Sequence, residues 1–309
     1  MVRWSDQENL IDWTPTVTNT AGSQRLSAGS EIIAARATRQ QTLIWTDTAL
    51  HSMRFTGPPF TFGFSMLANN ISIIGPNAVT TVGDKAFWMD RENFYVYTGS
   101  VQIIPCTLLR YVFDDINLEQ AFKSFAASNK MFDEVFWFYP SADSEEIDRY
   151  VKFNYVENTW DLGTMSRTAW VDSGVHDNPR ASGSVNDVNY VYIQETGDSA
   201  DGSAMNSFIE SSDFDLGDGE QFMFVSRLIP DIDITSSDST ASVNYVLKTR
   251  NYPGDSLATN STTAVTSTTE QSFLRSRSRQ AALRIESSAS DLTWTAGDLR
   301  LDIRPDGRR

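Results

Sequence analysis

The chain has 309 residues, of which 40% are hydrophobic and 21% charged, and its formal net charge is −15. This composition excludes an intrinsically disordered chain, and the length allows one large domain or two ordinary ones. The acidic balance argues against a general nucleic-acid binder, whose affinity depends on neutralising phosphates. Two interpretations remain open: charge kept for solubility, and an acidic wall along which DNA passes without adhering.

The sequence has no pattern typical of secretion or membrane insertion. Cys106 is the only cysteine, so no intramolecular disulfide can form and we expect folding in a reducing cytosol. The first residues lack the apolar stretch of a signal peptide. No segment approaches the roughly 20 apolar residues of a membrane helix, so we expect no membrane contact.

A Trp-x-Asp motif recurs along the first half of the chain. The copies are Trp4-Ser5-Asp6, Trp45-Thr46-Asp47, Trp88-Met89-Asp90 and a degenerate Trp137-Phe138-Tyr139. They are spaced 41, 43 and 49 residues apart, and such a period in strand-rich sequence is typical of β-propeller blades. Each copy ends an apolar strand and leads through a polar turn into a second strand. We expect the tryptophans to fill blade cores and the aspartates to cap turns by accepting backbone N–H groups.

One short helix is predicted between the third and fourth copies. Asp115 or Asn117 would be its N-cap, with Glu119 and Gln120 in the first turn. Its apolar stripe, at positions i, i+4 and i+7, would consist of Leu118, Phe122 and Phe125. We expect this stripe to pack on a sheet.

The composition changes beyond Gly183. Between Asp187 and Asp238 there are twelve acidic residues and one basic residue, Arg227. Ser/Thr-rich stretches alternate with three predicted strands, Phe222–Ile229, Ala241–Leu247 and Ala282–Glu286. We therefore predict an all-β chain: a propeller-like repeat over residues 1–183, incomplete or small, with one short helix, and a β-sandwich-like domain over residues 184–309.

An acidic run lies near the start of the second domain. It contains Asp213, Asp215, Asp218 and Glu220. Its spacing fails that of an EF-hand, because Gly217 occupies the fifth position where Asp or Asn is required. We interpret the run as an acidic turn between strands, and as a candidate lining for a channel; a calcium loop of another kind is the third interpretation.

Three arginines alternate with serines at Arg275, Arg277 and Arg279. Residues two apart share one face of a strand, so the three side chains would form a ridge. The ridge is either a solvated outer face, a contact for phosphates, or a docking surface for the acidic belt of a neighbouring subunit.

No catalytic, cofactor-binding or metal-binding residues are predicted. The two histidines, His51 and His176, are far apart in sequence and no G-x-S-x-G turn is present, so a Ser-His-Asp hydrolase is not indicated. One cysteine and two separated histidines do not supply a typical zinc site. The glycine-rich phosphate-binding motifs are absent as well.

Several segments resemble one protein family. The run from Arg3-Trp4-Ser5-Asp6 to Asn9, followed by Trp13-Thr14-Pro15 and Asn19-Thr20-Ala21-Gly22, resembles the tail nozzle (hub, or packaged-DNA stabilisation) proteins of short-tailed bacteriophages. Further similar segments are Ile44-Trp45-Thr46-Asp47, Gly57-Pro58-Pro59-Phe60, Phe87-Trp88-Met89 and the closing run from Leu301 to Arg309. The similar segments are spread over nearly the whole chain.

The resemblance implies a structural virion protein, made in the host cytoplasm and assembled as a ring, a hexamer, below the portal and adaptor proteins. It further implies that the ring seals packaged DNA and forms the ejection channel, with DNA passing without sequence-specific binding. Members of the family are typically longer at the N-terminus. Since closed propellers have about 4–8 blades, we expect a small propeller, an incomplete one completed by a second chain, or a part of a longer protein.

Two other functions remain as alternatives. One is a glycan-binding or glycan-hydrolysing propeller of a tail fibre or tailspike, with Trp160 and Asp161, or Glu145 and Glu146, as candidate residues. The other is a head-completion adaptor, which differs mainly in its place in the particle.

Overall fold

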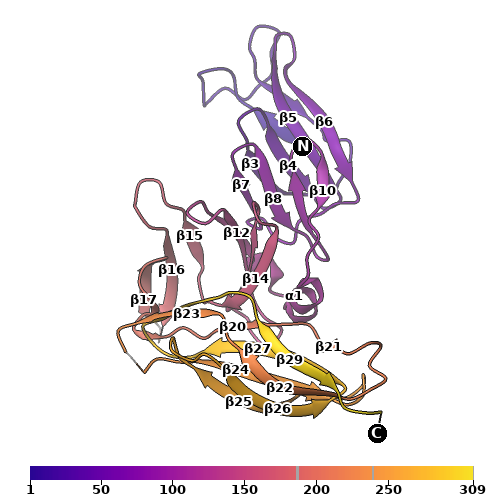
Figure 1. The fold of residues 1–309 in the computed structure, drawn as a ribbon. Helices are drawn as coiled ribbons and strands as arrows, with labels where there is room; N and C mark the ends of the chain where they lie inside the picture. Colours follow the sequence, from indigo (N-terminus) through magenta and orange to yellow (C-terminus); the bar gives the residue numbers. More distant parts are fainter. Residues whose placement is uncertain (186–187, 239, 309) are drawn as a thin grey trace. The chain divides into compact units, whose positions relative to one another are not determined.

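The computed structural model describes residues 1–185, 188–238 and 240–308, and it consists almost entirely of β-strands (Figure 1). It divides into two compact units, Met1–Glu195 and Thr196–Arg309. This boundary lies further along the chain than the expected one at 183/184. The reason is a hairpin of β16 (Arg180–Val185) and β17 (Val188–Ile193), whose strands pair across the expected position.

Four antiparallel sheets follow one another in the first unit, and in each of them strands adjacent in sequence pair. The first contains β3 (Ile32–Ala37), β4 (Thr42–Thr46), β5 (Ala49–Gly57) and β6 (Thr61–Asn69). The second contains β7 (Val79–Val82), β8 (Lys85–Met89), β9 (Phe94–Tyr97) and β10 (Val101–Ile103). The third contains β11 (Phe125–Asn129), β12 (Glu134–Tyr139), β13 (Arg149–Asn154) and β14 (Thr159–Thr164). The fourth has three strands, β15 (Ala169–Val171), β16 and β17.

The sheets are arranged like successive blades. Their first strands lie side by side, β3 with β7, β7 with β11, and β11 with β15. No sheet closes on itself in the described residues. The predicted all-β fold is confirmed, and the sequence repeat corresponds to this series of blade-like sheets.

The tryptophans of the repeat fill a common core. Trp45, Trp88 and Trp137 each lie on the second strand of a four-stranded sheet, and each is 0% exposed. The rings of Trp45 and Trp88 meet edge to face with centroids 5.4 Å apart. The Trp137 ring packs on Phe94 with centroids 4.8 Å apart, and both belong to the same buried cluster as Trp45 and Trp88. The degenerate fourth copy therefore has the same structural role as the second and third.

The aspartates of the repeat hold incoming loops. Asp6 Oδ1 accepts the backbone N–H of Thr20 at 2.7 Å. Asp47 Oδ1 accepts the N–H of Ser30 at 2.8 Å, and its Oδ2 accepts the Ser30 hydroxyl at 2.6 Å. The capping prediction is correct for these two copies, although the capped groups lie in distant loops, and Asp90 of the third copy accepts the N–H groups of Ser72 at 3.4 Å and Arg91 at 2.7 Å.

This capping makes stability depend on pH. The hydrogen bonds from the Ser30 hydroxyl and N–H lower the pKa of Asp47 below its ordinary value of 3.8. A lowered folded-state pKa gives stability that is present above the unfolded-state pKa and lost as the pH falls through the folded-state value. We expect Asp47→Ala to lower the thermal midpoint at pH 7, with a difference from wild type that shrinks below pH 3.8.

Circular dichroism melts between pH 2 and pH 7 would measure this effect. Asp84→Ala, at an exposed turn position, is the matched control and should have little effect at any pH. A difference for Asp47→Ala that stays constant over the whole pH range would contradict the assignment.

The first copy of the repeat occupies a different place. Trp4 lies on β1 (Val2–Trp4), which pairs only with β2 (Gly22–Gln24) in the described residues. Its ring packs on Phe62 and Phe64 of β6, with centroids 5.3 and 5.8 Å away. This copy therefore covers part of the edge strand of the first sheet and does not centre a sheet of its own.

The predicted helix is wrong in position. Helix α1 spans Leu109–Asp115 and ends where the predicted one begins; only a short 3-10 turn, η1 (Ala121–Lys123), follows. Ile116 instead bridges to Ser141, and the N–H of Asn117 donates to Pro140 O at 3.0 Å. These long-range bonds hold the segment extended.

The three residues of the predicted apolar stripe differ in burial. Phe125, the first residue of β11, is buried, while Leu118 and Phe122 are exposed.

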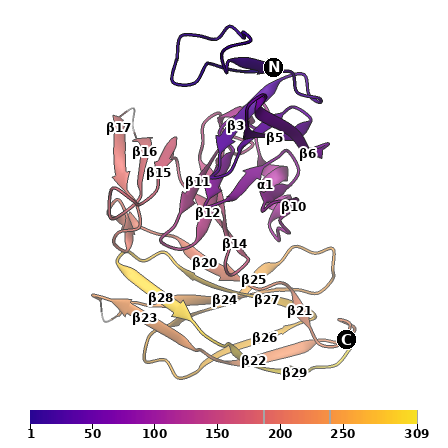
Figure 2. The same ribbon diagram turned by 90° about the horizontal axis from the view of Figure 1, so that it is seen from above.

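The second unit is a sandwich of two sheets (Figure 2). One contains β20 (Ser207–Glu210), β21 (Phe214–Asp215), β24 (Val243–Arg250), β25 (Ala258–Val265) and β27 (Gln280–Ser287). The other contains β22 (Met223–Ile229), β26 (Ser272–Ser278) and β29 (Arg300–Pro305). Beside them lie the pair β23 (Ile232–Ser236) and β28 (Leu292–Ala296) and the small hairpin of β18 (Ser199–Ala200) and β19 (Ser203–Ala204). Val225, Tyr245 and Leu283 belong to the buried core of this unit. All three strands predicted in this region are present.

Candidate functional site

The predicted arginine ridge lies on the outer face of β26. Leu274, Ser276 and Ser278 are buried, whereas the intervening Arg275 and Arg277 are exposed. Arg279 follows directly after the strand. The alternation read from the sequence therefore separates an inner and an outer face in the structure.

Aromatic rings lie between these arginines. The strand register places Phe224 of β22 between Arg277 of β26 and Arg304 of β29. The Arg304 guanidinium lies 4.9 Å from the Phe224 ring centroid. Phe222 is contacted by two guanidinium groups, those of Arg277 at 3.8 Å and Arg279 at 4.7 Å. Such cation–π contacts orient the planar groups while leaving donors for carboxylates or phosphates.

Six arginines are carried by β26, β22, β29 and the residue after β26. This set, called the arginine face below, comprises Arg227, Arg275, Arg277, Arg279, Arg300 and Arg304. Two acidic side chains pair within it, Asp302 with Arg227 at 2.7 Å and Asp306 with Arg277 at 2.6 Å. The face therefore carries excess positive charge in a chain whose net charge is −15.

The acidic run is largely engaged within its own unit. Asp213 forms an ion pair with Arg250, and Asp215 accepts the Gln280 amide N–H at 3.2 Å. Glu220 lies 3.8 Å from the guanidinium of Arg308. Asp218 is exposed.

The same turn contacts the arginine face. Arg279 donates to the backbone carbonyl of Glu220 at 2.6 Å and to that of Gly219 at 3.2 Å. The structure thus brings the two predicted charged sites together. Asp187, the first residue of the acidic segment, and Arg309, the last residue of the closing run, lie outside the described residues.

The second unit contains a further charged cluster that was not predicted from the sequence. Glu210 of β20 pairs with Lys248 of β24 at 2.7 Å and with Arg284 of β27 at 3.0 Å. Burial raises the pKa of Glu210, but hydrogen bonds from the two cations outweigh it, so its pKa lies below the ordinary value. The three residues come from distant segments that only strand register brings together, so no local signal pointed to them.

Neutralising this carboxylate should destabilise the second unit. We expect Glu210→Gln to cost about 1–3 kcal/mol at pH 7, because two half-buried cations lose a charged acceptor. The contribution is present above the unfolded-state pKa of Glu and lost as the pH falls through the lower folded-state pKa. Urea denaturation at pH 7 and pH 3 would measure both effects.

The exposed Glu270 provides the matched control. Glu270→Gln should change the free energy of unfolding by less than about 0.5 kcal/mol. If Glu210→Gln behaves like this control at pH 7, the cluster contributes nothing to stability.

The residues considered for glycan chemistry have structural contacts. Trp160 is half-buried, and its ring packs on Phe94 and Phe153 at 4.8 and 4.7 Å. Asp161 pairs with Lys152 at 3.4 Å. Glu146, beside Glu145, pairs with Lys123 at 2.6 Å.

The histidines are placed on separate elements. His51 is buried on β5, with Nε2 3.1 Å from the carbonyl oxygen of Ala28. His176 lies in the loop between β15 and β16. Among the described residues no group of three or more His, Cys, Asp and Glu side chains could hold a metal ion. No helix in the described part of the chain is long and apolar enough to cross a membrane.

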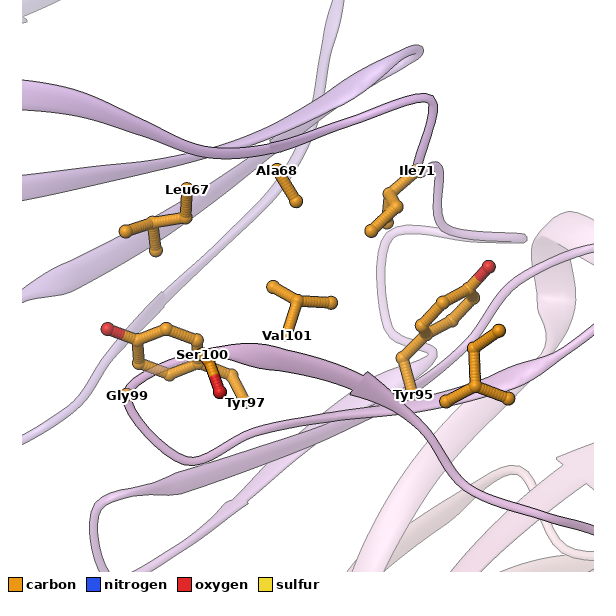
Figure 3. Close-up of a pocket in the computed structure, with 9 residues that line it drawn as sticks. Leu67, Ala68, Ile71, Tyr95, Tyr97, Gly99, Ser100 and Val101 are labelled. Atoms are coloured by element: carbon orange, nitrogen blue, oxygen red, sulfur yellow. The ribbon is translucent and has the colours of Figure 1, made fainter.

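A cleft of about 500 Å³ lies between the edge strands β6 and β10 (Figure 3). Leu67 and Ala68 face Val101 across it, as the close-up shows. Its other lining residues are Ile71, Tyr95, Tyr97, Gly99, Ser100 and Ile103. The lining contains no carboxylate, so the cleft lacks the acid pair that glycoside hydrolysis ordinarily uses.

Comparisons with known proteins add little to this picture. No protein-family model matches the chain, and no curated protein matches it. A solved structure described as "Glycoside hydrolase" is similar over 84% of this chain and 82% of that chain, at 11% sequence identity and a TM-score of 0.26. A similarity this low carries no argument about fold or function.

Proposed function

We propose that this chain is a structural protein of a bacteriophage tail, a component of the nozzle or hub ring that seals packaged DNA and forms the ejection channel. In this role it assembles with copies of itself, in a hexamer, and meets portal or adaptor proteins and other tail proteins. The protein is a component of the virion, and DNA passes it without sequence-specific binding.

The observation that carries the proposal is the use of the repeated motif for architecture. The three central tryptophans lie in one core, and the first two aspartates cap loops. The repeat therefore builds a series of rigid sheets whose last strands, such as β6 and β10, have no further strand partner in the described residues. A scaffold with open edges is suited to assembly with neighbouring chains.

The charge distribution supports the same role. A chain with net charge −15 repels phosphate, so a channel built from it would not retain DNA. The arginine face is a local exception on one sheet of the second unit. Arginine-rich, aromatic-containing surfaces are typical of protein–protein interfaces.

Assembly of the purified chain tests the proposal. Analytical ultracentrifugation and negative-stain electron microscopy should show closed rings in addition to any free monomer. Filter binding should show no retention of double-stranded DNA at physiological salt. A monomer at every concentration tested, combined with release of reducing sugar from a phage-receptor polysaccharide, would replace the proposal by the glycan-hydrolysing alternative.

A head-completion adaptor would also form a ring. It differs from a nozzle in its neighbours, so its position in the particle distinguishes the two.

A further inference from the structure

One long two-stranded ribbon of the second unit changes charge along its length. Strands β22 and β29 pair over its first part, and β23 and β28 pair beyond a bend at Pro230 and Gly297. The N–H of Gly297 donates to Asp231 O at 2.8 Å and so links the two parts. The arginine face covers the first part of this ribbon.

All charged residues of the second part of the ribbon are acidic. Its charged residues, called the aspartate end below, are Asp231, Asp233, Asp238, Asp291 and Asp298. No lysine or arginine occurs in residues 228–247 or 285–299. All five residues are exposed, and none makes an ion pair within the described part of the chain.

The two ends expose their charges on the outside of the sandwich. On β23, Asp233 is exposed between Ile232 and Ile234, which pack against the core. On β22 and β29, the core-facing Val225 and Ile303 alternate with the outer Phe224 and Arg304 in the same way. The ribbon therefore presents positive charge at one end and negative charge at the other.

We propose that the aspartate end of one copy docks on the arginine face of a second copy of this chain. The inference rests on the proposed structural role and identifies the contact through which copies associate. Guanidinium groups held over phenylalanine rings are oriented before binding, and Arg–carboxylate pairs are geometrically specific. Contacts between like ends are disfavoured because like charges repel, so the pairing selects unlike ends.

A second copy explains the surface better than nucleic acid does. Asp302 and Asp306 already pair with Arg227 and Arg277, so the face lacks the continuous positive charge that binding of a polyanion requires, whereas an Arg–carboxylate pair needs only one guanidinium group. The remainder of the chain is strongly acidic, which opposes approach of a polyanion.

Charge reversal at each end tests the contact in the full chain. Arg275→Glu with Arg304→Glu changes two arginines whose guanidinium groups lie over the rings of Phe273 and Phe224. Asp233→Lys with Asp298→Lys changes the aspartate end. By sedimentation velocity, wild type should self-associate more strongly at 50 mM than at 500 mM salt, and each double variant should weaken association about tenfold or more.

Mixing provides the sharper result. A mixture of the two double variants should form a complex that neither forms alone, and a chain carrying all four substitutions should regain self-association. Arg39→Glu with Arg91→Glu, two exposed arginines of the first unit, is the control with the same charge change as the arginine-face variant. Circular dichroism spectra and thermal midpoints equal to wild type would establish that each variant is folded.

The outcomes separate the two proposals. If wild type associates and neither reversal weakens it more than the control does, the docking contact is wrong while a ring role survives. If the arginine reversal leaves association intact but abolishes binding of a double-stranded oligonucleotide, the face is a nucleic-acid site and the inference is overturned. If wild type never self-associates, this inference and the proposed function fail together.

Discussion

Replacing Trp88 by alanine is expected to lower the free energy of unfolding of the first unit by about 3–5 kcal/mol. The side chain is fully buried, stacks on Tyr95 with centroids 5.3 Å apart and meets the ring of Trp45. Its Nε1 also donates to the carbonyl of Ser72 at 3.1 Å. Removing the indole leaves a cavity and an unpaired carbonyl oxygen, and urea denaturation followed by circular dichroism would measure the loss.

Trp13→Ala is the matched control for this change. Trp13 lies in the loop between β1 and β2 and is 44% exposed, so its removal should cost less than about 0.5–1 kcal/mol. Equal losses for the two variants would mean that the repeated tryptophan does not organise the core, and the architectural reading of the motif would be wrong.

In the second unit, Leu283→Ala should cost about 2–5 kcal/mol. Leu283 is buried on β27, opposite Leu247 of β24 in the strand register. Truncation opens a cavity between the two sheets, which can close only partly because core packing is dense. The same urea titration, read through near-ultraviolet circular dichroism, would report the change.

Leu299→Ala is the corresponding control, since Leu299 is 41% exposed between β28 and β29. Because each unit has its own core, Trp88→Ala and Leu283→Ala are expected to act on different unfolding transitions and to add when combined. Strong non-additivity in the double variant would show instead that the two cores unfold as one.

Most strands could be predicted from local sequence alone. Phe94–Tyr97, for example, is an apolar run between polar turns, and the structure makes it β9. The spacing of Trp45, Trp88 and Trp137 likewise predicted which strands occupy equivalent places in successive sheets, whereas Trp4 lies on a separate strand pair. These signals are local, because the order of apolar and polar residues along a strand matches the order of its buried and exposed side chains.

The helix prediction failed because the competing signal is not local. Asn117 has good N-capping chemistry, but its N–H bonds to the carbonyl of Pro140, which lies far along the chain. Propensity is a weak prior that such tertiary contacts override. The real helix, α1, has no side-chain hydrogen bond at its N-cap, so the usual start signal was absent.

The candidate site was predictable only in part. The alternation of Arg275 and Arg277 indicated a shared face, as observed. The stacking of Phe224 against Arg304 depends on the register of β22 and β29, which are separated by most of the unit, so sequence spacing could not reveal it. For the same reason the ion pair of Asp213 with Arg250 could not be predicted, and no feature of the sequence indicated that this carboxylate has a basic partner.

The aspartate end illustrates the same limit. Asp233 belongs to the acidic segment noted in the sequence, whereas Asp298 lies 65 residues further on, and the pairing of β23 with β28 brings their segments together. Strand pairing converts two weakly acidic segments into one surface without basic residues.

The most direct test of the proposed structural role is a cryo-electron microscopy map of the phage particle in which the proposal places this chain. We expect its density in a closed ring around the axial channel of the tail, with an arginine face of one copy next to the aspartate end of another. Density for the chain only in side appendages away from the channel, or none in the particle, would contradict the account.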